Sequence, residues 1–367
     1  MKQLLIGLLL AFLLTIPAAA VDPVDDQLAQ YDITGLEKAV PDDAQRLLDG
    51  AEVDIGVDFS GKLLSLAKNA FENTGDALRQ GLAVAVKVVG IAALCGIAQT
   101  LIASGESKLP VVTLAGTAAI AAVTLTDAGT LCRLASSMID EMSVFSKLLL
   151  PVLVSAGAAS GAVVTASARA PAVLFLCDVV ITTLDGFVVP AIYCHLALSL
   201  AQTVSGEESL GKIAAMLKTC ITMILRTVLT LFLTYFSLTG ILSGTTDAVA
   251  LKTAKLALST GLPVVGSIMA DAADAVITGA KLVRNALGVF GVLVLVATAA
   301  VPFLRIGIQF LLYKLAAAFS SLCADAPLVK LIDGIGESFG LLLGLCGTCT
   351  LLLLLAVFTG MTIGGFT

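Results

Sequence analysis

Long apolar segments separated by short polar stretches dominate the chain from residue 82 onward. Most of them have about 20 residues or more, the length that a helix needs to cross a hydrocarbon layer of about 30 Å. The pattern therefore predicts an all-α polytopic membrane protein with seven to eight transmembrane helices. The seven apolar segments are roughly 82–103, 110–131, 148–168, 171–204, 217–242, 286–313 and 338–363.

The segment 171–204 is too long for one untilted span. It contains Asp185, Gly186 and Pro190, so we expect a kink or a broken helix there.

The first 20 residues have the pattern of a secretory signal peptide. Lys2 precedes an apolar stretch from Leu4 to Ile16, and Pro17 and three alanines follow it. A short apolar core that ends in small residues is typical of a cleaved signal. We expect cleavage after Ala20; an uncleaved first anchor is the alternative.

Residues 21–81 form an acidic arm that the pattern predicts to be helical and extracytoplasmic. Between Asp22 and Gln80 there are 13 acidic and 5 basic side chains, a net charge of −8, whereas the whole chain has a net charge of −6. The apolar positions of this arm follow helical spacing but are too few to form a large core. Residues 82–367 are then a multi-span membrane domain.

The composition excludes an ordinary soluble enzyme. Hydrophobic residues make up 58% of the chain, charged residues only 13%, and the mean hydropathy is +1.03. A globular domain has about twice that charged share. Lipid is therefore the expected surrounding, and the absence of a basic cluster argues against nucleic-acid binding.

Two stretches of the chain resemble each other and suggest an internal repeat. Leu150 to Thr165 aligns with Leu262 to Thr278, and Pro151 and Pro263 are 112 residues apart, as are Pro190 and Pro302. The hypothesis is a duplication with units 148–242 and 260–362, as in many transporters. Shared alanine and valine bias is the alternative explanation. The four prolines are candidate helix breaks because proline cannot donate a backbone hydrogen bond.

Several ionisable residues fall inside apolar segments, where charge is costly and usually faces a cavity or a partner. Asp185, Arg226 and Arg305 lie deepest and are the candidates for an intramembrane polar path or for ion pairs. A structural pair without a transport role is equally compatible with the sequence. His195 is the one histidine of the chain, and we interpret it as a hydrogen-bonded helix residue.

The sequence contains no recognisable catalytic constellation, so we predict neither an enzyme nor a cofactor. There is no Walker lysine loop, and metal sites that need two histidines are excluded. Cys346 and Cys349 have the spacing of a redox motif but lie in an apolar run without the βαβ context of that motif. We interpret them as buried apolar side chains.

Residues 146–167 and 253–291, together with the signal peptide, resemble the stage III sporulation protein AE family of endospore-forming bacteria. The resemblance implies a sporulation-specific membrane subunit of a multiprotein channel that links the mother cell and the forespore. It implies a permease-like or export-gate-like role in the mother-cell membrane around the forespore. The implied partners are other stage III sporulation A-operon proteins, including an ATPase and ring-forming subunits, and a forespore membrane protein.

Two other classes of function stay open from the sequence. One is an independent secondary transporter with a site at the repeat interface, and the other is a purely structural membrane scaffold. A transporter would need Asp185, Arg226 or Arg305 for substrate movement, whereas a scaffold would tolerate their neutralisation.

Overall fold

The computed structural model describes residues 33–48, 59–102, 110–161, 163–261 and 265–362. All regular structure in these ranges is helical, which confirms the predicted all-α class. The predicted signal peptide, 1–20, and Pro263 lie outside the described residues.

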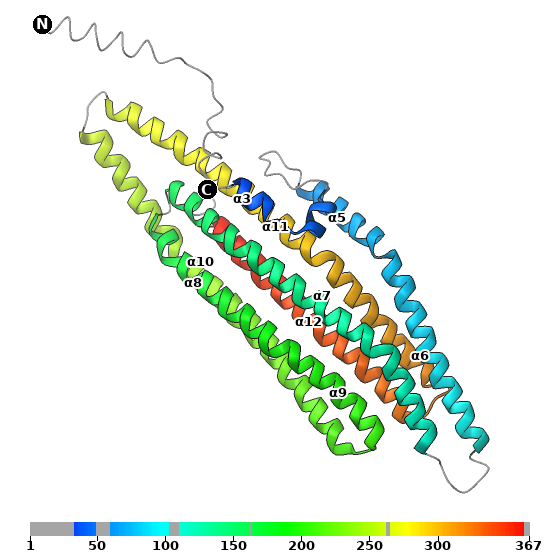
Figure 1. Cartoon of the computed structure of the whole chain (residues 1–367). Helices are drawn as coiled ribbons and strands as arrows, with labels where there is room; N and C mark the ends of the chain where they lie inside the picture. The colour runs from blue at the N-terminus through cyan, green and yellow to red at the C-terminus, as the bar shows by residue number, and fades with distance from the viewer. Residues whose placement is uncertain (1–32, 49–58, 103–109, 162, 262–264, 363–367) are drawn as a thin grey trace, which may run out of the picture.

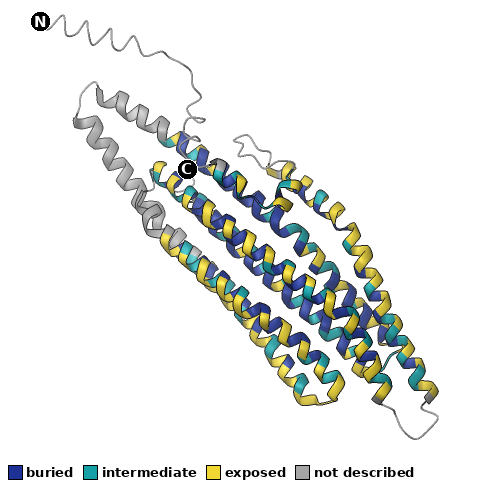
Figure 2. Cartoon of the chain, in the orientation of Figure 1, coloured by how far each residue is buried: buried dark blue, intermediate teal, exposed yellow. Residues whose placement is uncertain are grey.

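Seven long helices run along one common axis and form an elongated bundle (Figure 1). Three of them, α7, α11 and α12, lie in its middle, with α6 along one edge and α8 to α10 along the other. Figure 2 shows the middle helices as the most buried ones, and α6 and α10 as largely exposed. The seven helices are α6 (Gly75–Ile102), α7 (Pro110–Ala159), α8 (Val163–Thr183), α9 (Val189–Ser205), α10 (Glu208–Gly261), α11 (Val265–Ser320) and α12 (Ala326–Thr362).

Six helical segments within the described residues are long and apolar enough to cross a membrane, where the sequence predicted seven or eight spans. The difference arises in α7, which joins the predicted segment 110–131 to the first part of the segment 148–168 in one helix of 50 residues. The stretch between them is polar, but no glycine or proline lies between Gly129 and Pro151. Polarity alone does not end a helix when the residues are good helix formers.

The third predicted segment, 148–168, does not form a single span, because a turn lies inside it. Helix α7 ends at Ala159, and Gly161 adopts a φ of 94°. Glycine takes this conformation without the steric cost that a side chain would impose. Helix α8 then starts at Val163 and runs back along α7.

A π-helix, η1 (Leu184–Val188), interrupts the regular helix between α8 and α9, where Asp185, Gly186 and Pro190 predicted a kink or break. Pro151 and Pro302, also proposed as breaks, instead lie inside α7 and α11, which continue through them. A helix that packs on its neighbours tolerates a proline because other groups satisfy the freed carbonyl. Only Pro190 therefore accompanies a change of helix type within the described residues.

The closest packing in the bundle joins α11 and α12, which run antiparallel. Three large aromatic side chains of α11 lie over glycines of α12. A Cβ atom on Gly340 would approach the Phe310 ring to 3.0 Å, and one on Gly347 would approach Phe303 to 3.4 Å. The Cβ atom of Tyr313 lies near Gly336, and the Tyr313 ring contacts the ring of Phe339 edge-on at 5.1 Å. Small residues allow this close approach where no hydrophobic effect drives helices together.

The described part of the N-terminal arm packs on the bundle. It consists of three short helices, α3 (Ile33–Lys38), α4 (Asp42–Leu47) and α5 (Phe59–Asn73), which contact α7 and α11. Leu36, Leu47 and Leu66 are buried in these contacts. The arm thus gains from the bundle the apolar core that its own sequence lacks. The proposed internal repeat stays a prediction, because the start of its second unit includes residues outside the described ranges.

Helix α6 crosses the turn between α11 and α12 at one glycine. A Cβ atom on Gly96 would overlap the backbone carbonyl oxygen of Cys323, and backbone cannot rotate away as a side chain can. A Cβ atom on Gly90, on the exposed side of the same helix, would meet no neighbouring helix within 4 Å. A comparison of the same substitution at Gly96 and at Gly90 therefore distinguishes an effect on packing from an effect on helix propensity.

We predict that Gly96→Ala lowers the thermal unfolding temperature of the protein in detergent. Overpacking of this kind costs about 1–3 kcal/mol, which exceeds the gain of about 0.5–1 kcal/mol from replacing a helical glycine. Gly90→Ala is the matched control and should leave the unfolding temperature unchanged or raise it. Equal unfolding temperatures for the two variants would contradict the contact between α6 and the α11–α12 turn.

Candidate functional site

A buried polar cluster joins α9, α10 and α12 near one end of the bundle. His195 of α9 is 2% exposed, and its Nδ1 atom lies 2.8 Å from the hydroxyl of Ser338 on α12. Its Nε2 atom lies 4.0 Å from the carboxylate of Glu337. Lys218 of α10 donates to the other oxygen of that carboxylate over 2.5 Å. One carboxylate therefore lies between an ammonium group and an imidazole.

Helical spacing explains why these side chains converge. On α9, His195, Ser199 and Gln202 are separated by four and three residues, so they share one face. On α12, Gly334 and Ser338 lie one turn apart opposite that face, and a Cβ atom on Gly334 would be 2.9 Å from the Ser199 hydroxyl oxygen. The missing side chain lets the two helices approach until His195 reaches Ser338.

The hydrogen bonds around His195 fix the orientation of its ring. The Ser338 hydroxyl donates to the carbonyl of Gly334 at 3.1 Å, so its oxygen can accept a hydrogen bond from the Nδ1–H group of His195. The Ser199 hydroxyl donates to the carbonyl of His195 at 3.0 Å. In this arrangement Nε2 faces the carboxylate of Glu337.

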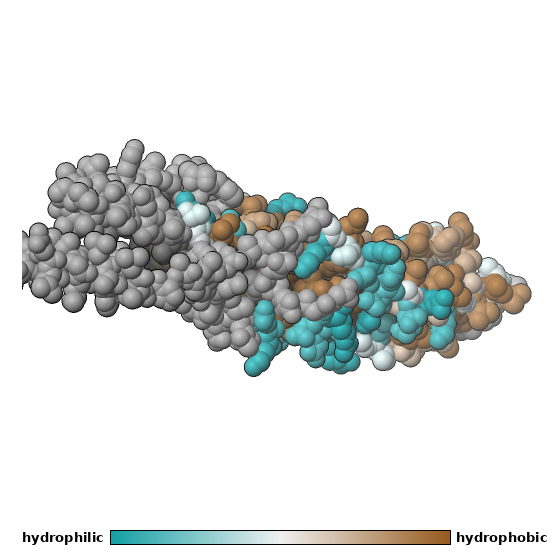
Figure 3. Space-filling view, turned by 90° about the horizontal axis from the view of Figure 1, so that it is seen from above, coloured by the Kyte–Doolittle hydropathy of each residue, from teal (hydrophilic) through white to brown (hydrophobic). Residues whose placement is uncertain are grey.

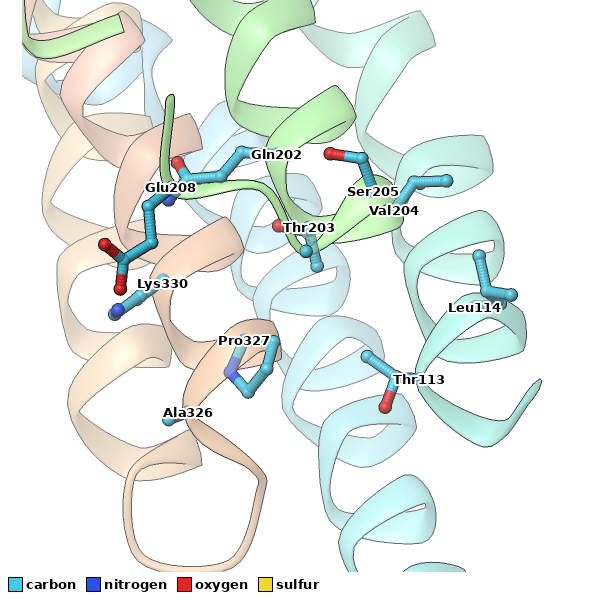
Figure 4. Close-up of a pocket in the computed structure, with 11 residues that line it drawn as sticks. Thr113, Leu114, Gln202, Thr203, Val204, Ser205, Glu208, Ala326, Pro327 and Lys330 are labelled. Atoms are coloured by element: carbon cyan, nitrogen blue, oxygen red, sulfur yellow. The ribbon is translucent and has the colours of Figure 1, made fainter. Parts of the chain in front are cut away.

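A pocket of about 380 Å³ opens at the adjacent end of the bundle (Figure 4). Gln202 and Ser205 contribute to its wall from the end of α9, Glu208 from the start of α10, and Lys330 from α12. Thr113 of α7 lies on the opposite side from Glu208 and Lys330 in Figure 4. The pocket thus presents an acid, a base and several neutral hydrogen-bonding groups.

The pocket and the buried cluster belong to one line of polar groups. Gln202 is two helical turns from His195 on α9, and Lys330 is two turns from Glu337 on α12. We call this line the polar seam. It consists of the residues Gln202, Ser199 and His195 of α9, Lys218 of α10, and Lys330, Glu337 and Ser338 of α12.

A second ion pair flanks the seam on the other side of α12. Lys314 of α11 donates to Asp333 at 2.5 Å. Further along α11, Gln309 donates to Asp127 of α7. The described residues contain no group of three or more histidine, cysteine, aspartate or glutamate side chains that could hold a metal ion. The arrangement suits the solvation of polar or charged groups inside the bundle.

The three deep charges singled out in the sequence do not meet. Asp185 lies in η1 and accepts a hydrogen bond from Ser136 of α7 at 2.9 Å. Arg226 on α10 and Arg305 on α11 have exposed side chains. Among the described residues, no ion pair joins any two of these three. Whether they form a polar path stays a prediction.

The sequence indicated that His195 is a hydrogen-bonded helix residue, and the structure places it in such a bond. The apolar pattern did not select Lys218 or Glu337, because both lie at the edges of apolar segments, where charged residues are common. Helical spacing could not reveal that Lys218 pairs with Glu337, because the two residues lie on different helices and are 119 residues apart in the chain.

An all-α bundle with six apolar spans and a buried polar seam defines a polytopic membrane protein. Comparison with known families gives the particular one. The model of the stage III sporulation protein AE family matches residues 57–364, so the chain belongs to this family.

The stage III sporulation protein AE of Bacillus subtilis (strain 168) is similar to the chain, with 30% identity over 233 residues. The alignment covers 64% of this chain and 58% of that protein. The chain therefore matches little more than half the length of this relative. No solved structure matches the chain.

We predict that Lys218 and Glu337 stabilise the fold as a pair. Lys218→Met or Glu337→Gln alone should lower the free energy of unfolding by about 1–3 kcal/mol, because each leaves a charge without its partner. Lys218 is 42% exposed, so its own effect should be near the lower limit. The double variant should lose less than the sum of the single losses, measured by thermal unfolding in detergent.

Lys212→Met is the matched control, on an exposed position of α10 with no ion pair among the described residues. It should leave stability unchanged. Strictly additive losses in the Lys218 and Glu337 variants would show that the two side chains do not interact.

Proposed function

We propose that this sporulation membrane protein is a permease-like or export-gate-like subunit of a multiprotein complex that links the mother cell and the forespore. The family match supports the sporulation context. The polar seam supports the permease-like role, because it leads from an end pocket to a half-buried ion pair and a buried histidine between apolar helices. Polar residues at such depth are costly and are typical of a path for polar substances.

The other subunits of the proposed complex would provide the ATPase activity for which this sequence has no motif. Its other members are stage III sporulation A-operon proteins, including an ATPase and ring-forming subunits, and a forespore membrane protein. An ATPase partner is consistent with the absence of a Walker loop from this sequence. The protein lies in the mother-cell membrane that surrounds the forespore, with the N-terminal arm on the extracytoplasmic side.

A structural scaffold is the second candidate, and one observation favours it. Arg226 and Arg305 are exposed on two helices that are apolar enough to span the membrane. An outward arginine at membrane depth needs a polar partner, which another subunit of the complex could provide. In a scaffold these arginines, and not the polar seam, would be the residues that function requires.

The test is affinity purification of the tagged protein from sporulating cells in mild detergent, combined with spore counts. We expect other stage III sporulation subunits to co-purify. Glu337→Gln should preserve co-purification but reduce spore yield at least tenfold, because it changes the path without changing the outer surface. Lys212→Gln is the control and should match the unchanged protein in both measurements.

Other outcomes would identify the alternatives. If Arg226→Gln and Arg305→Gln abolish co-purification while Glu337→Gln sporulates normally, the protein is a scaffold. If nothing co-purifies and the protein alone moves a solute in reconstituted vesicles, it is an independent transporter, and the proposed complex is wrong.

A further inference from the structure

The outward face of α7 is polar along the middle of the helix. Its exposed positions between residues 130 and 147 follow a spacing of three or four, and only Val144 among them is apolar. We call the polar part of this face the charged stripe. It consists of Arg133, Ser137, Asp140, Glu141 and Lys147.

Few partners within the chain neutralise the charged stripe. Lys147 pairs with Asp178 of α8 at 2.6 Å, but both side chains are about half exposed, at 56% and 53%. Ser137 donates to Glu141 at 3.0 Å. Asp140 and Glu141 are adjacent in sequence and both exposed, so two like charges lie side by side on the surface.

Contacts of the buried face of α7 with α11 and α12 indicate the position of the charged stripe along the membrane normal. Met142 accepts a hydrogen bond from Thr350 of α12 at 3.9 Å, and the ring of Phe145 lies 6.2 Å from that of Phe290 of α11. Both partners lie inside uncharged runs, 339–358 on α12 and 286–304 on α11. Runs of about 20 apolar residues match the thickness of the hydrocarbon layer. The charged stripe is therefore level with the hydrocarbon core.

Lipid cannot be the medium that the stripe faces. A charged side chain at the bilayer centre is unfavourable by about 2.5–3.5 kcal/mol even on insertion scales, and this stripe has four of them. An apolar protein contact is also unsuitable, because an unpaired buried charge is strongly destabilising. Water solvates both signs of charge and also the adjacent pair Asp140 and Glu141.

Apolar side chains are exposed on other helices at the same depth as the charged stripe. Figure 3, which views the molecule from above, shows hydrophilic residues gathered in one region of the described surface and hydrophobic residues over much of the rest. At the depth of Met142, the apolar Leu351 of α12 is 49% exposed, and Leu231 of α10 is 63% exposed. These two side chains mark the part of the surface that suits lipid.

We propose that the charged stripe of α7 lines a water-filled passage at membrane depth, through which hydrophilic solutes move. Because the stripe contains both cationic and anionic groups, it does not select strongly for one sign of charge. One bundle supplies only one wall of such a passage, so this inference rests on the proposed role as a subunit of a larger membrane assembly.

Cysteine labelling in membranes from sporulating cells tests the proposal. Ser137→Cys places a thiol on the stripe, and Val144→Cys places one on the same exposed face between Glu141 and Lys147; we call these two the stripe cysteines. Leu351→Cys places a thiol at the same depth on an apolar part of the surface. The parent has the exposed Cys194, Cys220 and Cys323 replaced by serine. With a water-soluble, membrane-impermeant maleimide applied to opened membranes, the stripe cysteines should react at least tenfold faster than Leu351→Cys. Labelling in SDS verifies that all three thiols are present.

Two results would overturn the proposal. If the stripe cysteines react as slowly as Leu351→Cys, another protein or lipid covers the stripe. If all three react quickly, the bilayer does not reach this depth of the bundle. Neither result depends on co-purification, so a failure of the proposed complex and a failure of the water-filled passage are distinguishable.

Discussion

The close antiparallel packing of α11 on α12 is the contact on which the rest of the bundle depends. Aromatic side chains of α11 fill the spaces that glycines of α12 leave open, as Phe310 does over Gly340. This pair is buried in the middle of the molecule, and α6, α7, α9 and α10 all pack against it. A larger residue at Gly340 would press on the Phe310 ring and disturb this contact.

Helix α12 also determines where polar groups lie inside the bundle. The apolar run of α12 begins at Phe339, and directly before it come Glu337 and Ser338, which hold His195 and Lys218. The polar seam therefore begins where the glycine-rich contact ends. In an apolar surrounding these groups are stable only because each has a partner, so the seam requires the particular register that α9 and α10 take along α12.

The chain belongs to the stage III sporulation protein AE family, and its described surface has both charged and apolar parts. Lipid makes each charge at the depth of the apolar helices unfavourable. In the assembly that we propose, the charged stripe would face water and the apolar side chains of other helices would face lipid.

Much of the architecture follows from the sequence alone, and the reason is that apolar length and helix propensity are local properties. The all-α membrane class and the interruption near Asp185 and Pro190 could be derived in this way. The continuity of α7 could not, because the polar stretch around Asp140 suggested a loop while its residues favour helix. The family also followed from local sequence, at 146–167 and 253–291, and the family comparison confirmed it.

The candidate site was decided by tertiary structure. Asp185, Arg226 and Arg305 lie deep within apolar segments of the sequence, as a polar path would require. In the structure Asp185 contacts Ser136, whereas Arg226 and Arg305 are exposed on two other helices. Lys218 and Glu337 are ordinary segment-edge charges until α10 and α12 pack with the register that brings them to 2.5 Å. Sequence determines which residues are apolar or charged and which helices they form. Only the packing of helices distant in the chain determines which charges meet, because register and rotation depend on contacts such as those at Gly334 and Gly340.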